Sequence, residues 1–173
     1  MNKLALGAAA ITLILMTGCG NSAANVNTNG TEATDAVTTA SIVDNEAAFK
    51  TAISKDGTWI AATLKNLTFS EELVVDGQFV NEGKPARKLA LYTQDEDQSI
   101  TDSFSLTAPK LIIKSENTQL EGGIFIGDVY VEADGFSVTS ATVRGNVYFA
   151  NKQYFSTFNL GDQGIVTGVA KVK

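Results

Sequence analysis

The acidic segment 94–98, with the sequence QDEDQ, is the densest group of potential metal ligands in the chain. Asp95 and Asp97 stand at alternate positions and carry hard carboxylate oxygens, which are the ligands that calcium prefers in proteins. A solvated acidic loop between two strands explains the same residues, and it is the interpretation we prefer. We therefore name Asp95 and Asp97 only as a weak calcium candidate, and we otherwise predict no metal and no cofactor.

Histidine is absent from the 173 residues, which removes the commonest general base and a common metal ligand. Histidine-dependent nucleophilic triads and ordinary zinc sites are therefore excluded. The chain carries 13 Lys and Arg against 19 Asp and Glu, a net charge of −6, and it has no basic patch that would attract nucleic-acid phosphates. These features predict a protein that is not an enzyme and has no nucleic-acid partner.

Cys19 is the only cysteine, and it follows a segment with the composition of a secretory signal. Within residues 1–18, Lys3 is the only charge, and an apolar run from Leu4 to Met16 precedes two small residues. The tripeptide MTG directly before Cys19 resembles the bacterial lipobox, in which the chain is cut before the cysteine and the cysteine receives a lipid. The resemblance implies a lipoprotein signal peptide over 1–18, lipid attachment at Cys19, and a location in the cell envelope, on the extracytoplasmic face of a bacterial membrane. A buried or free thiol is the other interpretation of a lone cysteine.

Residues 20–40 are rich in Asn, Thr, Ala and Gly and contain no aromatic residue and no periodic apolar residue. Such a segment cannot bury enough surface to offset the entropy lost on ordering it. We predict a flexible tether over 19–40 that lifts a domain away from the membrane. The remaining length of about 130 residues is enough for one domain with a core.

A short capping helix is predicted within residues 41–56. Asp44 or Asn45 can cap its first turn, and Gly57 lies just past its expected end at Lys55. Four apolar residues are spaced three or four apart and share one helix face: Ala48, Phe49, Ala52 and Ile53. This face must pack against another element.

The pentads GDVYV and GNVYF begin 18 residues apart, at Gly127 and Gly145. The same step relates Val129 to Leu111, Val147 and Ile165, and a second series runs through Leu106, Ile124, Thr142 and Leu160. A repeat this short cannot close a core alone, so consecutive copies must stack and share one. The segment beginning at Leu67 resembles the one at Leu106, and the surplus length between them is expected in a protruding loop over 81–88.

The repeat predicts an all-β fold in residues 57–173, a single-stranded parallel β-helix (β-solenoid) of about six coils with a repeat of about 18 residues. Equivalent residues of successive coils then lie above one another. The outward-facing column is expected to contain Ile112, Tyr130, Tyr148 and Val166. Such a column stabilises a sheet by cross-strand stacking. It is also the kind of apolar surface that marks an interface, and the two tyrosines are suited to stacking on sugar rings.

The segments GIFIGDVYVEA and SATVRGNVYFAN carry a rhythm of Val and Gly that resembles the bactofilins, the polymer-forming cytoskeletal family. The resemblance covers residues 106–172 well and extends loosely back to Leu67. It implies a right-handed β-helix that assembles end to end into filaments without nucleotide.

The predicted function is that of a lipid-anchored structural or scaffolding protein of the cell envelope, bactofilin-like and capable of forming polymers. Its expected partners are the membrane, through the lipid, and either further copies, through the solenoid ends, or other envelope components. Phe49 and Ile53 are expected to close the first coil, whereas Val169 and Val172 leave the last coil open. The alternatives are a surface carbohydrate-binding or adhesive module and a small glycan-active enzyme, because β-helices include polysaccharide lyases and hydrolases.

Overall fold

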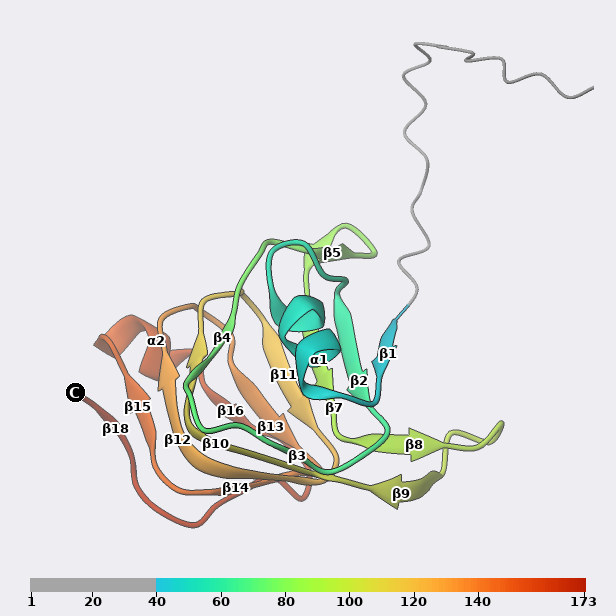
Figure 1. Cartoon of the computed structure of the whole chain (residues 1–173). Helices are drawn as coiled ribbons and strands as arrows, with labels where there is room; N and C mark the ends of the chain where they lie inside the picture. The colour runs from blue at the N-terminus through green and yellow to red at the C-terminus, as the bar shows by residue number, and fades with distance from the viewer. Residues whose placement is uncertain (1–39) are drawn as a thin grey trace, which may run out of the picture. The chain divides into compact units, whose positions relative to one another are not determined.

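The structure is a computed structural model that describes residues 40–173 of the chain. This part is mostly β, as the sequence predicts, and its two larger sheets are parallel throughout (Figure 1). The first sheet has the order β1 (Ser41–Val43), β2 (Ile60–Thr63), β7 (Arg87–Ala90), β11 (Thr118–Glu121), β13 (Ser137–Thr139) and β16 (Asn159–Leu160).

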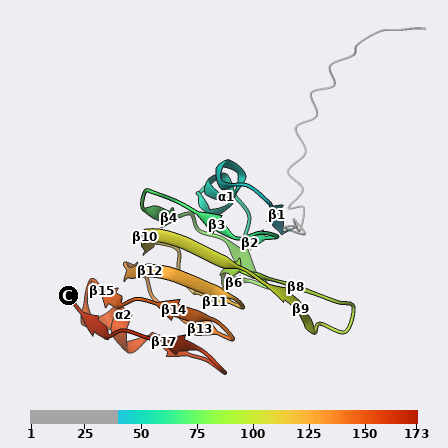
Figure 2. The ribbon, with the colours of Figure 1, turned by 60° about the horizontal axis from the view of Figure 1, so that its bottom comes forward.

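The second sheet contains strands that lie between these in the chain, together with the two strands that follow β16. Its members are β3 (Leu67–Thr68), β4 (Leu73–Val75), β10 (Ser105–Ile113), β12 (Ile124–Val131), β14 (Thr142–Arg144), β15 (Val147–Phe149), β17 (Ile165–Val166) and β18 (Ala170–Val172). From β10 onward the chain therefore alternates between the two sheets. Figure 2 shows successive strands stacked side by side, with α1 at one end of the stack and the carboxyl terminus at the other.

The predicted spacing is confirmed in the centre of the second sheet. Leu111 pairs with Val129 and Val129 with Val147, each 18 residues further on, and all three are buried. The predicted likeness between the segments that begin at Leu67 and at Leu106 is confirmed too, because these two residues pair on neighbouring strands. The core between the two sheets consists of such inward-facing residues. Equivalent residues of successive strands lie above one another.

The second predicted series is shifted by one residue at its start. Leu106 pairs with Phe125, not with Ile124, because the register changes between Thr107 and Lys110. At this bulge two residues of β10 face the single residue Gly127. A Cβ atom at Gly127 would lie 1.9 Å from the carbonyl oxygen of Ala108, so only glycine allows this close approach.

Both series are wrong in the last strands. In the first series, Val147 pairs with Ala170 and not with Ile165. In the second, Thr142 pairs with Ile165 and not with Leu160, which pairs with Val138. The reason is a second helix, α2 (Lys152–Ser156), which lies between β15 and β16 and lengthens the spacing from 18 to 23 residues. Asn151 caps this helix by accepting a hydrogen bond from the Tyr154 amide.

The surplus length in the first half of the chain is held in two antiparallel hairpins. One joins β5 (Val80–Asn81) to β6 (Lys84–Pro85), within the loop predicted at 81–88, although the end of that range belongs to β7. The other joins β8 (Tyr92–Gln94) to β9 (Ile100–Ser103) and projects from the body of the sheets (Figure 1).

The predicted amino-terminal helix is α1 (Glu46–Ile53), inside the expected range. Asn45 is its N-cap and accepts a hydrogen bond from the Ala48 amide at 2.9 Å. Phe49, Ala52 and Ile53 are buried, so the predicted apolar face covers the core at this end of the sheets. The chain also contributes strand β1 before the helix, which the sequence pattern did not indicate because only three residues pair.

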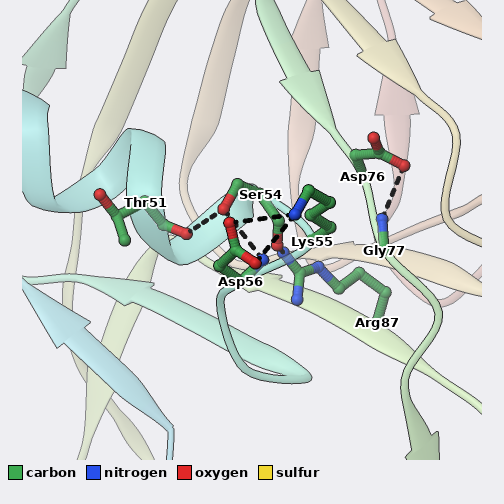
Figure 3. A network of polar contacts seen from close by, with 7 residues as sticks. All are labelled: Thr51, Ser54, Lys55, Asp56, Asp76, Gly77 and Arg87. Carbon is green, nitrogen blue, oxygen red and sulfur yellow. Dashed lines mark hydrogen bonds and ion pairs between the residues drawn. The ribbon is translucent and has the colours of Figure 1, made fainter.

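A buried arginine ties α1 to the first sheet. Arg87 is 1% exposed and occupies an inward position on β7. Its guanidinium donates to the carbonyl oxygens of Ala52 at 2.8 Å and Ser54 at 3.3 Å, at the carboxyl end of α1, and also to that of Thr58. Figure 3 shows Arg87 beside the residues that follow the helix. Burial lowers the pKa of Arg87 to about 10, so the group is still charged at neutral pH.

Candidate interaction site

Two stacked tyrosines on the outer face of the second sheet form the centre of the candidate site. Tyr130 on β12 pairs with Tyr148 on β15, and their ring centroids are 5.1 Å apart with the planes tilted by 44°. Ile112 on β10 pairs with Tyr130 on its other side. The structure therefore brings together three of the four residues predicted for the outward column. All three side chains are half-buried.

The fourth predicted member, Val166, is wrong. Lys171 occupies the position beside Tyr148, and Val166 instead pairs with the inward residue Val143. The cause is α2, whose five residues displace the last strands along the sequence. The column therefore ends in a cation and not in an aliphatic side chain.

Three lysines surround the tyrosine rings. Lys173 Nζ lies 4.5 Å from the ring centre of Tyr130 and 5.4 Å from that of Tyr148, and it donates a hydrogen bond to the Tyr130 hydroxyl at 3.3 Å. Lys171 Nζ is 5.8 Å from the ring of Tyr148, and Lys110 Nζ is 5.0 Å from that of Tyr130. Such cation–π contacts contribute about 0.5 to 1 kcal/mol each at exposed sites. Sequence reasoning did not place Lys171 and Lys173 at this site because it gave the last strand the wrong register.

The three lysines differ in their acidic neighbours. Lys110 lies 2.9 Å from a carboxylate oxygen of Glu72, and this carboxylate raises the pKa of Lys110. Within residues 40–173, no carboxylate lies within 4.0 Å of the ammonium group of Lys171 or Lys173. The two lysines of the last strand therefore carry positive charge that no ion pair neutralises in the described part of the chain.

A hollow of about 190 Å³ adjoins the tyrosines. Ala150 lies between Glu132 and Lys173 on neighbouring segments of the chain, and its small side chain leaves this space open. The lining residues are Tyr130, Val131, Glu132, Tyr148, Phe149, Ala150 and Lys173. The hollow thus combines aromatic surface with one carboxylate and one ammonium group. We call the two tyrosines, the three lysines and this hollow the tyrosine–lysine face.

A larger groove of about 740 Å³ lies on the outer face of the first sheet, beside the β8–β9 hairpin. Ala62 and Ala90 are neighbours on adjacent strands and leave the space open. Its rim carries the exposed aliphatic side chains of Ile42, Leu64 and Ile100. Lys88 and Glu121 also line it and form an ion pair at 2.5 Å, so the groove presents no uncompensated charge from this pair.

The calcium candidate lies at the tip of the β8–β9 hairpin. The side chain of Asp95 accepts hydrogen bonds from the amides of Asp97 and Ser99 at 3.0 and 2.9 Å, so it closes the turn. Among the residues that the structure describes, no group of three or more His, Cys, Asp or Glu side chains converges as a metal site would require. Asp95 therefore has a structural role in this turn.

Within residues 40–173, no element covers the carboxyl-terminal end of the two sheets. Leu160 pairs with the buried Val138 and so occupies an inward position, yet it is 49% exposed. Val166 and Val172 also stand at inward positions and are only half-buried. The opposite end differs, because there the side chains of α1 cover the core.

Cys19 and the predicted signal and tether segments lie outside the described residues. In residues 40–173, no helix has the length and hydrophobicity needed to span a membrane. Comparisons of the chain with protein-family models, with curated proteins and with solved structures found no match.

Proposed function

We propose that residues 57–173 form a β-solenoid of about six coils that acts as a scaffold in the cell envelope and associates with further copies of itself through its last coil. The proposal is supported by parallel strands that alternate between two sheets and by paired residues that recur every 18 positions. The lipobox-like sequence at Cys19 supports attachment to a membrane. The resemblance of residues 106–172 to the bactofilins supports assembly of further copies.

The uncovered carboxyl-terminal end is the observation that carries the proposal. Leu160 exposes half of an inward side chain, and in the part of the chain that the structure describes, β16, β17 and β18 each have a neighbouring strand on one side only. Unpaired strand edges recruit further strands. Because α1 covers the other end, two copies are expected to meet through their last coils in a symmetric dimer.

We expect the domain of residues 40–173 to dimerise with increasing concentration in sedimentation velocity, and the variant Leu160→Glu to remain monomeric. In a two-fold symmetric dimer the glutamate of one copy would lie near the same glutamate of the other copy. Burial of these like charges opposes association. The matched control is Ile42→Glu, which changes an equally apolar residue, 63% exposed, at the end covered by α1. Only monomers at high concentration, or equal effects of both variants, would contradict the proposed interface.

The anchor is tested separately with Cys19→Ser. We expect the variant to lose fatty-acid labelling and to shift from the detergent phase to the aqueous phase, because the sequence contains no other thiol. The unchanged protein provides the control in the same cells. A variant that still incorporates labelled fatty acid would show that the lipobox assignment is incorrect.

A further inference from the structure

We propose that the tyrosine–lysine face binds a saccharide unit that carries an acidic group, a role beyond that of a scaffold. Tyr130 and Tyr148 supply the ring surface, and Lys171 and Lys173 supply the charge. The proposal depends on the arrangement of these four side chains at one end of the second sheet. It does not require the domain to associate with itself.

The two tyrosines suit the apolar side of a sugar ring. Their rings lie 5.1 Å apart on neighbouring strands and are half-buried, so the strands beneath hold them in place. Fixed aromatic rings with a polar edge offer large contact area at low entropic cost. The adjoining hollow of about 190 Å³ is smaller than the pockets that enclose whole drug-sized ligands. It is therefore suited to one unit of a longer chain that continues into solvent.

The lysines select for negative charge on that unit. The chain as a whole carries a net charge of −6, but Lys171 and Lys173 lie together without an ion-pair partner in the described residues. Both ammonium groups lie within 6 Å of a tyrosine ring, so an acidic group on a stacked ring would come within reach of them. Glu132 on the far side of the hollow can accept a hydrogen bond from a sugar hydroxyl.

An anionic membrane surface is the rival partner, since tyrosine and lysine also favour lipid headgroups. The geometry favours the saccharide. The tyrosines are half-buried beside a hollow instead of projecting from the protein, and Glu72 and Glu132 flank them. The headgroups of a flat anionic surface would lie against the carboxylates of Glu72 and Glu132 and be repelled by them. A single sugar unit is small enough to lie between these two carboxylates.

The test uses the chain from residue 20 onward, so that every described residue is retained, and polygalacturonate as the probe. Its fully methyl-esterified form has the same rings without the charge, and polyphosphate has charge without rings. Binding is measured by isothermal calorimetry at low and physiological salt. We expect binding to polygalacturonate that weakens with salt, and binding at least about tenfold weaker to the two other polymers.

Two variants and their controls identify the site. Tyr148→Ala and the pair Lys171→Gln/Lys173→Gln should each weaken binding at least about tenfold, while Tyr148→Phe keeps it because the ring remains. The controls are Ile126→Ala, at an exposed position earlier on β12, and Lys84→Gln/Lys152→Gln, with the same change of charge elsewhere. Thermal unfolding of each variant establishes that it is folded.

Four outcomes would overturn the proposal. The first is the absence of binding to polygalacturonate, and the second is equal binding to polyphosphate, which would show that charge alone is recognised. The third is an equal loss of binding in the control variants. The last is tighter binding to vesicles of anionic phosphatidylglycerol than to the polysaccharide, which would assign the face to a membrane.

Discussion

Replacing Arg87 by methionine is expected to lower the free energy of unfolding by about 3 kcal/mol. Methionine fills much of the same volume but removes the guanidinium donor from the carbonyl oxygens of Ala52, Ser54 and Thr58, and only that of Ser54 keeps a second donor, the Gly57 amide. The first two belong to the carboxyl end of α1, where carbonyls have no partner within the helix. Loss of the cation also removes a favourable interaction with the helix dipole.

Chemical denaturation measures this loss, and hydrogen exchange locates it. We expect the amides of α1 to exchange faster in Arg87→Met while those of β12 and β15 at the centre of the second sheet change less, because the guanidinium of Arg87 donates to carbonyls at and just after the end of α1. The variant Arg87→Lys keeps the charge but cannot reach all three carbonyls, so its loss should be smaller. Lys84→Met is the control, since Lys84 is exposed and its replacement should change stability by less than about 0.5 kcal/mol.

The effect of Arg87→Met should not vary between about pH 6 and pH 9. Burial lowers the pKa of Arg87 in the folded protein to about 10, below its ordinary value in the unfolded chain, so the side chain is protonated in both the folded and the unfolded state throughout that range. Only above about pH 10 does the folded state release this proton before the unfolded state does. The stability contributed by this group then rises with pH, and the difference between the two proteins changes. A loss below about 1 kcal/mol at pH 7 would show that water replaces the guanidinium at the three carbonyls.

The centre of the second sheet was predictable because local chemistry repeats there. The two glycines that open the pentads, Gly127 and Gly145, stand where a Cβ atom would strike the carbonyl of the preceding strand, at 1.9 and 2.0 Å. Apolar residues alternate after each of them, so the sequence carries both the spacing and the direction of the side chains. The amino-terminal helix was predictable for a similar reason, since Asn45 and the face containing Phe49 are local signals.

The rest depends on contacts that no local pattern encodes. The short helix α2 has no buried residue, so its sequence has no periodic apolar face that would predict a helix. It shifted the last strands by five residues and exchanged Val166 for Lys171 in the outward column. Arg87 lies within the segment 81–88 that was expected to be a loop, and its burial depends on α1, which lies more than thirty residues earlier. The tyrosine pair was therefore predictable, whereas the lysines beside it and the burial of Arg87 against α1 were not.

Replacing Phe149 by alanine is expected to cost about 3 to 5 kcal/mol of folding free energy, the range for large-to-small changes in a core. Phe149 is fully buried between the inward residues of the neighbouring strands, Val131 and Val172. Its ring centre also lies 5.2 Å from that of Phe155 on α2 and 5.1 Å from that of Phe158 just after it. The side chain thus joins the second sheet to the helix that sets the register of the last strands.

Chemical denaturation of Phe149→Ala, Phe155→Ala and the double variant separates these two roles. Phe155 is 44% exposed, so its replacement should cost only about 1 kcal/mol. If the rings stabilise each other, the double variant should lose about 0.5 to 1.5 kcal/mol less than the sum of the single variants. Strict additivity would show that α2 is held in place by the Phe158 ring stacked on Phe136 at 5.8 Å, and that Phe149 acts only in the core. In either case the cavity should loosen β18, which pairs only with β15, so the amides of β18 should exchange faster than those of β10.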